Sequence, residues 1–160
     1  MTLQQDSSKD FEINTQQVEK ESLAERFKNE RDAWTKKIAE LSKSMKNVSD
    51  LPVLQTIIYT ERQIALDYYH YLVSLIVILS REYRKQYNDK YDYYTTKSQI
   101  RYPNEATKNN RILTDLSEIF QKKEMLENHI KASDNYIKTL DNIIYGISKR
   151  VDIENIIRGR

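Results

Sequence analysis

Residues 112–151 read ILTDLSEIFQKKEMLENHIKASDNYIKTLDNIIYGISKRV, and this stretch decides the fold. Its apolar residues recur at steps of three, four or seven positions, which is close to the 3.5-residue repeat of a coiled coil. The repeat passes in phase through Ser133-Asp134-Asn135, so the sequence predicts one long helix over residues 107–150. The residues that carry the repeat are Ile112, Leu116, Ile119, Leu126, Ile130, Ile137, Leu140, Ile144, Ile147 and Val151.

A second long helix precedes this one. Apolar residues at helical spacing predict it over residues 68–95, with Tyr71–Leu79 apolar enough to be buried on most sides. Residues 96–106 break the period and contain Pro103, so they predict the loop of a helical hairpin. Near the C-terminus, Arg150-Val151-Asp152 predicts a final bend.

The N-terminal third has a different character. Residues 1–21 are polar and predict a mobile arm, and the domain that carries the hairpin spans residues 50–160. Between them, residues 22–49 predict an amphipathic helix that starts with a capping box at Ser22-Leu23-Ala24-Glu25. Ser49-Asp50-Leu51-Pro52 is expected to stop that helix and to cap the next.

Glycine and proline occur twice each among the 160 residues, where average usage would give about 11 and 8. Because the turns of sheets need these residues, the composition excludes sandwiches, barrels and doubly wound sheets. The predicted fold class is therefore all-α: a long helical hairpin with an extra N-terminal helix and coiled-coil-like packing.

The composition also excludes several kinds of chemistry. The chain has no cysteine, so it has no disulfide, iron–sulfur cluster or thiolate zinc site, and two glycines cannot build a phosphate-binding loop. The two histidines, His70 and His129, lie in no motif, and we expect both at the surface or its rim. The sequence therefore predicts no catalytic residue, no metal site and no cofactor.

The sequence gives no sign of a membrane segment. Its longest apolar run, Tyr71–Leu79, is interrupted by Ser74 and is shorter than the ~20 residues that span a bilayer. The N-terminus has neither a basic start nor an apolar signal segment. We expect a soluble cytoplasmic protein with no membrane partner, and a membrane-surface helix is the weakest interpretation because Trp34 lies far from the basic residues described next.

Residues 81–111 hold eight basic and four acidic side chains and six of the twelve tyrosines. Cations that follow phosphates, with rings that stack on bases, are typical of a surface for single-stranded nucleic acid. Tyr83 and Tyr87 continue the apolar stripe and are expected in the core or an interface, and a merely solvated face is the alternative interpretation of the charges. The predicted DNA-binding residues are Arg81, Arg84, Lys85, Lys90, Tyr94, Lys97 and Arg101.

The apolar repeat is longer than one partner helix can cover, which predicts self-association. Its last part has no charged residue at the repeat positions. We name this part the C-terminal seam and assign it to oligomerisation; its members are Ile137, Leu140, Ile144, Ile147 and Val151.

Tyr93-Tyr94-Thr95-Thr96-Lys97 resembles the Tyr-Tyr-(Ser/Thr)-Gly-Lys/Arg motif of the UvsY-like recombination mediators of tailed phages, where it ends a long basic helix. A helical stretch with Tyr71-Leu72 precedes it, and the tail Arg150–Ile157 is similar to the family's Arg-x-x-Ile-Lys-x-x-Ile segment. The resemblance covers residues 50–160. Thr96 stands where the family has glycine, and Glu154 where it has lysine.

This resemblance implies a single-stranded DNA-binding protein without catalytic activity that forms a ring-like homo-oligomer, a heptamer being one candidate. Such mediators help to load a RecA-like recombinase onto DNA coated by single-strand-binding protein, in phage recombination, repair and recombination-dependent replication in the cytoplasm of the infected cell. Lys90 and Lys97 are the DNA-binding residues that the resemblance carries over. The residues alone leave an alternative: a structural coiled-coil adaptor or scaffold that binds no nucleic acid.

Overall fold

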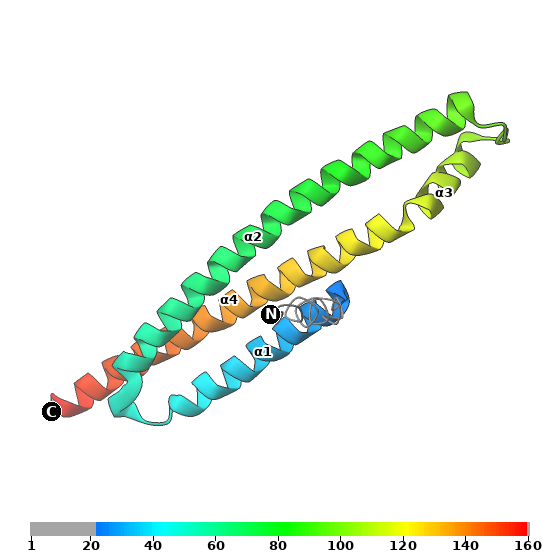
Figure 1. Ribbon diagram of the computed structural model, residues 1–160. Helices are drawn as coiled ribbons and strands as arrows, with labels where there is room; N and C mark the ends of the chain where they lie inside the picture. The colour runs from blue at the N-terminus through cyan, green and yellow to red at the C-terminus, as the bar shows by residue number, and fades with distance from the viewer. Residues whose placement is uncertain (1–21, 160) are drawn as a thin grey trace, which may run out of the picture.

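The computed structural model describes residues 22–159, and the predicted arm over residues 1–21 lies outside them. The described residues are 91% helical and contain no strand, and one long helix packs against another, which confirms the predicted all-α class. Figure 1 shows a long hairpin with a shorter helix along about half of its length. The α-helices are α1 (Leu23–Ser44), α2 (Leu51–Asp92), α3 (Glu105–Asp115) and α4 (Ser117–Arg158).

The two arms of the hairpin are α2 and α4, each of 42 residues, or about 63 Å at 1.5 Å per residue. They run antiparallel, and α1 lies against both of them in the half of the hairpin that contains the start of α2 (Figure 1). The main core fills this three-helix half. Its fully buried members are Leu51 and Ile58 of α2 with Leu140 and Ile147 of α4.

The C-terminal seam lies in this core. Ile137, Leu140, Ile144 and Ile147 are all buried, and they pack within the single chain against residues of α1 and α2. Val151 is partly buried against the same cluster. The sequence assigned the seam to self-association, but its own chain already covers it. An interface between copies therefore has to use other surfaces.

The start of α1 follows the predicted capping box. The Ser22 hydroxyl accepts from the backbone N–H of Glu25 at 3.2 Å, and the Glu25 carboxylate accepts from the backbone N–H of Ser22 at 3.0 Å. The predicted cap of the next helix is present only in part: α2 begins at Leu51 with Pro52 in its first turn, but the side-chain hydrogen bond of the cap is absent. Asp50 makes no side-chain hydrogen bond to the start of α2, because its carboxylate accepts instead from the Asn47 amide at 2.7 Å in the short 3₁₀ turn Val48–Asp50.

The second arm differs from the prediction at both ends. Leu116 has φ −98° and ψ 7°, which separates α3 from α4 where one continuous helix was expected. The apolar repeat does not reveal this break, because Leu116 stays buried in phase with the core face. At the other end the expected bend at residues 150–152 is absent. There α4 continues straight to Arg158, and Arg150 donates to the backbone carbonyl of Met45 at 2.7 Å.

The prediction that Tyr71–Leu79 is buried on most sides is wrong. Tyr71, Val77 and Ile78 are 50%, 47% and 62% exposed. The reason is the length of α1: its first buried residue, Phe27, packs against Leu72 of α2, and beyond that level only two helices remain to cover each other.

The same exposure explains a second feature of α2. The helical segment Val48–Lys97 is long and apolar enough to cross a membrane by length and composition alone, and 11% of its most apolar 18-residue window is buried. The apolar run Tyr71–Leu79 alone is too short to reveal this, because the apolar window extends beyond it. Length and composition are weak grounds for a span, but they show that α2 carries apolar surface that the described chain leaves uncovered.

A polar cluster with aromatic walls holds α1 to both arms. His129 of α4 is fully buried, where a surface position was expected, and its ring stacks between Phe27 at 3.9 Å and Trp34 at 5.1 Å. Its Nε2 lies 2.7 Å from the Glu30 carboxylate of α1, to which the Tyr68 hydroxyl of α2 also donates. We name Glu30, Tyr68 and His129 the three-helix lock.

The geometry of the lock fits a neutral histidine. Nε2–H can donate to Glu30, whereas Nδ1 is buried without a partner among the described residues. Protonation would place an unsatisfied N–H at Nδ1, which is costly in a buried site. Burial accordingly lowers the pKa of His129. Burial also raises the pKa of Glu30, but hydrogen bonds from Tyr68, Arg26 and His129 leave it below its ordinary value.

Acid should therefore destabilise the fold in two steps. Both groups bind fewer protons in the folded chain than in the unfolded chain, so the free energy of unfolding falls as pH drops through the ordinary histidine value of 6.5 and then through the glutamate value of 4.5. Urea unfolding between about pH 8 and about pH 5.5 measures the first step, because this range brackets the free histidine.

His129→Gln should remove most of that first step. The matched control is His70→Gln, which changes the other histidine of the chain, an exposed one, and should leave the pH dependence as in the parent. An undiminished loss of stability in His129→Gln over the same pH range would contradict the account of the lock.

Candidate nucleic-acid interface

The tyrosine motif forms an unusual end to α2. After Asp92 the chain continues as the π-helix η2 (Tyr93–Lys97), in which the N–H of Ser98 donates to the carbonyl of Tyr93 at 2.9 Å. The hydroxyls of Thr95 and Thr96 donate to carbonyls one turn earlier, at 2.8 and 2.7 Å. Thr96 thus stands within a helix, where no glycine is needed. Short π-helical turns occur frequently at functional sites.

An acidic residue of α3 ties the two arms together beside this motif. Asp115 accepts from the Tyr94 hydroxyl at 2.5 Å, and it forms ion pairs with Lys90 at 3.2 Å and Arg111 at 3.3 Å. The hydroxyl of Tyr94 and the ammonium of Lys90 lower the pKa of the Asp115 carboxyl. Tyr94 and Lys90, both predicted to bind DNA, are therefore engaged in holding α2 to α3.

Lys108 of α3 also links the two arms, although the sequence did not predict it as a site residue. Its side chain is 8% exposed, its ammonium lies 4.1 Å from the centre of the Tyr91 ring, and it donates to Thr95 at 3.1 Å and Glu105 at 2.9 Å. The hydrogen bond to Glu105 raises the pKa of Lys108. One signal was available, because Lys108 lies four residues before Ile112 and so in phase with the buried repeat.

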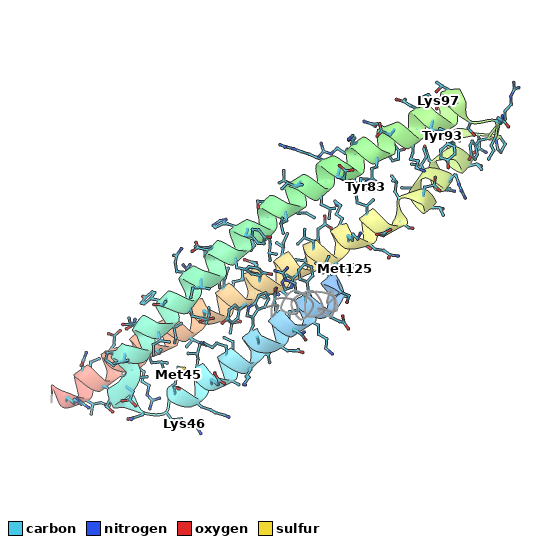
Figure 2. All side chains as sticks on the ribbon, viewed as in Figure 1. Met45, Lys46, Tyr83, Tyr93, Lys97 and Met125 are labelled. Carbon is cyan, nitrogen blue, oxygen red and sulfur yellow. The ribbon has the colours of Figure 1, made fainter. Side chains whose placement is uncertain are left out.

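Most tyrosines of this region are likewise part of the packing. Tyr83 lies on the side of α2 that faces α4 (Figure 2), and its ring centre is 6.3 Å from that of Phe120. The Tyr87 hydroxyl donates to Asn109 at 3.2 Å, which agrees with the expected interface position. Tyr93, by contrast, is 49% exposed. The tyrosines thus stiffen the hairpin end and leave few rings free to stack on bases.

The remaining predicted DNA-binding cations, unlike Lys90, do not take part in this packing. Five of them are exposed and form no ion pair with any residue of the described chain, and they continue around the end of the hairpin over about 24 Å of helix and the following loop. Glu82, Asp89 and Asp92 lie on the same helix and reduce the local charge. We name the five the basic group: Arg81, Arg84, Lys85, Lys97 and Arg101.

A hollow of about 620 Å³ opens at the end of the hairpin beside Arg101. Tyr94, Tyr102 and Lys108 line it together with the loop before α3. Its aromatic rings and the exposed Arg101 can contact a planar, anionic group, whereas Lys108 is already paired with Glu105, which also lines the hollow. In the described part of the chain, no group of three or more His, Asp or Glu residues is arranged to hold a metal ion.

The two predicted site groups lie in different halves of the molecule. The basic group belongs to the two-helix half, whereas the C-terminal seam is part of the core of the three-helix half. Figure 2 shows Lys97 of the basic group at one end of the molecule and, toward the other end, Met45, which packs against the core that contains the seam. Comparison with protein families, with curated proteins and with solved structures finds no match to this chain. The resemblance to the UvsY-like mediators therefore stays a prediction.

Tyr94→Phe should destabilise the chain by about 0.5–1.5 kcal/mol, because it removes the hydrogen bond that the hydroxyl donates to Asp115 and the longer one, 3.5 Å, that it accepts from Arg111. Tyr93→Phe is the matched control, since that neighbouring hydroxyl is exposed and makes no hydrogen bond with any described residue. Urea unfolding measures both. Equal stability of the two variants would show that the Tyr94 hydroxyl does not hold α3 in place.

Proposed function

We propose that this protein is a single-stranded DNA-binding recombination mediator that helps to load a RecA-like recombinase onto DNA coated by single-strand-binding protein. The observation that carries the DNA-binding part is the basic group, five exposed cations without ion-pair partners in the described chain, around the end of a stiffened hairpin. A cation that already pairs with a carboxylate attracts a phosphate less strongly than an unpaired cation does. The loading function rests on the resemblance to the UvsY-like mediators.

The physical basis of binding is electrostatic and independent of sequence. Each cation that neutralises a phosphate of a single strand releases counterions, so the logarithm of affinity falls by about 0.7 per contact for each decade of salt. The stiff end of the hairpin adds to this, because cations held on an ordered helix lose little further freedom on binding. Lys90 is expected to contribute less than its neighbours, since Asp115 competes for its charge.

A mediator of this kind is also proposed to act as a homo-oligomer in the cytoplasm of an infected cell. The C-terminal seam is not available for assembly, but the end of α4 offers another surface. Ile153, Ile156 and Ile157 are 56%, 62% and 63% exposed, at the i, i+3, i+4 spacing of one helix face. An oligomer would cover this face, and light scattering of the full chain measures that assembly directly.

The alternative function is a structural adaptor without nucleic-acid binding. One observation favours it: Tyr87, Tyr91 and Tyr94 contact α3 rather than standing free to stack on bases. In that case the basic group would be only a solvated face. The two functions differ in one measurable quantity, the salt dependence of binding to a single strand.

Arg81→Ala, Arg84→Ala and Lys85→Ala, combined in one variant, should weaken binding of a labelled oligothymidylate and flatten the salt slope by about 2, from three lost phosphate contacts. All three side chains are exposed and unpaired, so helicity and thermal stability should remain as in the parent. Fluorescence anisotropy over a salt series measures affinity and slope together.

A second triple variant controls for net charge. Lys36→Ala, Lys43→Ala and Lys46→Ala remove the same number of exposed cations from α1 and the turn after it, in the three-helix half of the molecule. Figure 2 shows Lys46 at the end opposite to Lys97. This control should keep the parent slope at nearly the parent affinity. An equal loss of affinity in both variants would show that binding depends only on the overall charge of the protein. Full affinity in both variants would favour the structural adaptor.

A further inference from the structure

An apolar groove lies where the three-helix half of the molecule becomes the two-helix half. It encloses about 370 Å³, and its walls come from the first turn of α1, the middle of α2 and the early part of α4. Tyr71, Leu75 and Ile78 form the α2 wall, Leu126 belongs to α4, and Leu23 closes one end. Tyr71 and Ile78 are at least half exposed, so the described chain leaves this apolar surface in contact with water.

The groove continues the path of α1. Along the three-helix half, α1 covers the space between α2 and α4, and this cover ends at Leu23 while both long helices continue (Figure 1). The 21 residues that precede Ser22 in the sequence must therefore start at the mouth of the groove.

The composition of those 21 residues matches the surroundings of the groove. They contain the apolar residues Leu3, Phe11, Ile13 and Val18, and they hold five acidic against two basic side chains. The groove leads to the basic group, since Lys85 lies seven residues, or two helical turns, beyond Ile78 on the same face of α2. Apolar anchors followed by acidic residues are complementary to an apolar groove followed by unpaired cations.

The reach also fits. Ile78 of the groove wall and Lys85 are seven residues apart on α2, or about 10 Å at 1.5 Å per residue. An extended chain spans about 3.3 Å per residue, so three residues cover that distance. The arm can thus place Ile13 beside Ile78 and bring Asp10, three residues earlier, to Lys85.

We propose that residues 1–21 dock in the groove between α2 and α4 of their own chain and place their acidic residues against Arg81 and Lys85. Docking covers the apolar wall that α1 leaves open. It replaces the simpler expectation of a mobile arm. The arm would also compete with a nucleic-acid strand for the basic group, and this part of the inference rests on the proposed function.

The absence of cysteine from the chain allows a direct test by disulfide cross-linking of the full-length protein. Ile13→Cys is paired with Glu82→Cys at the groove or with Ile64→Cys as the matched control. Position 64 lies eighteen residues, five helical turns, before position 82 on the same face of α2 and outside the groove. Ile64 is 59% exposed, so both partner positions are accessible.

With docking, the groove pair should close about tenfold faster than the control pair under the same oxidant, from the higher effective concentration of the two thiols. The product should run as a monomer on a denaturing gel, and Ile78→Asp should slow it to the control rate. Equal rates for the two pairs would overturn the proposal. A product that runs mainly as a cross-linked dimer would also overturn it, because the groove would then hold a second copy.

Binding of a labelled oligothymidylate then separates this inference from the proposed function. The chain with its arm locked by the disulfide should bind about fivefold or more weakly than the same chain after reduction, because cations held by the arm release fewer counterions. Equal affinity for the oligonucleotide before and after reduction would contradict the inference that the arm competes with DNA for the basic group. Fast closure of the groove pair with no binding in either state would support docking and contradict the proposed function.

Discussion

The structure depends on a difference in helix length: α1 has 22 residues, and the two helices that it packs against have 42 each. Three helices can bury a continuous core, whereas two helices leave most of their surface in water. The three-helix lock fixes where α1 lies along the hairpin, because Glu30, Tyr68 and His129 come from three different helices and form hydrogen bonds with one another around the buried His129 ring. The molecule is thereby divided into a half that is stable through its own core and a half that projects from it.

This division assigns different tasks to the two halves. The projecting half buries fewer apolar side chains, Ile112 and Leu116 among them, so polar contacts contribute more to holding it together. These contacts join Asp115 to Tyr94 and Lys90, and Lys108 to Glu105 and the Tyr91 ring. These ties occupy several of the groups that a sequence pattern assigns to DNA. The cations that remain unpaired are those on the outer face and in the loop. The proposed DNA surface is therefore the part of the basic-aromatic pattern that the fold does not need for itself.

The sequence predicted the helical class and the start of α1, because apolar spacing and the capping box at Ser22 are local signals. It misplaced two bounds, since α1 ends at Ser44 rather than at residue 49, and α2 begins at Leu51 rather than at residue 68. It could not predict the break at Leu116, where the buried repeat stays in phase, or the exposure of Ile78, which depends on where α1 starts in space. The burial of His129 needed knowledge of Glu30, 99 residues away in the sequence. For the same reason the C-terminal seam was assigned to a second copy. A periodic apolar stripe predicts a partner helix, but it does not distinguish a helix of the same chain from a helix of another copy.

Hydrogen exchange of the full chain, free and with an oligothymidylate, tests the central claim most directly, because it reports on each half separately. We expect slow exchange of the backbone amides in α1 and in the parts of α2 and α4 that α1 covers, and faster exchange around η2 and α3. Addition of the oligonucleotide should slow exchange around residues 81–101 and leave the three-helix half unchanged. Uniform protection along the hairpin without DNA, or an effect of DNA confined to the three-helix half, would contradict the account.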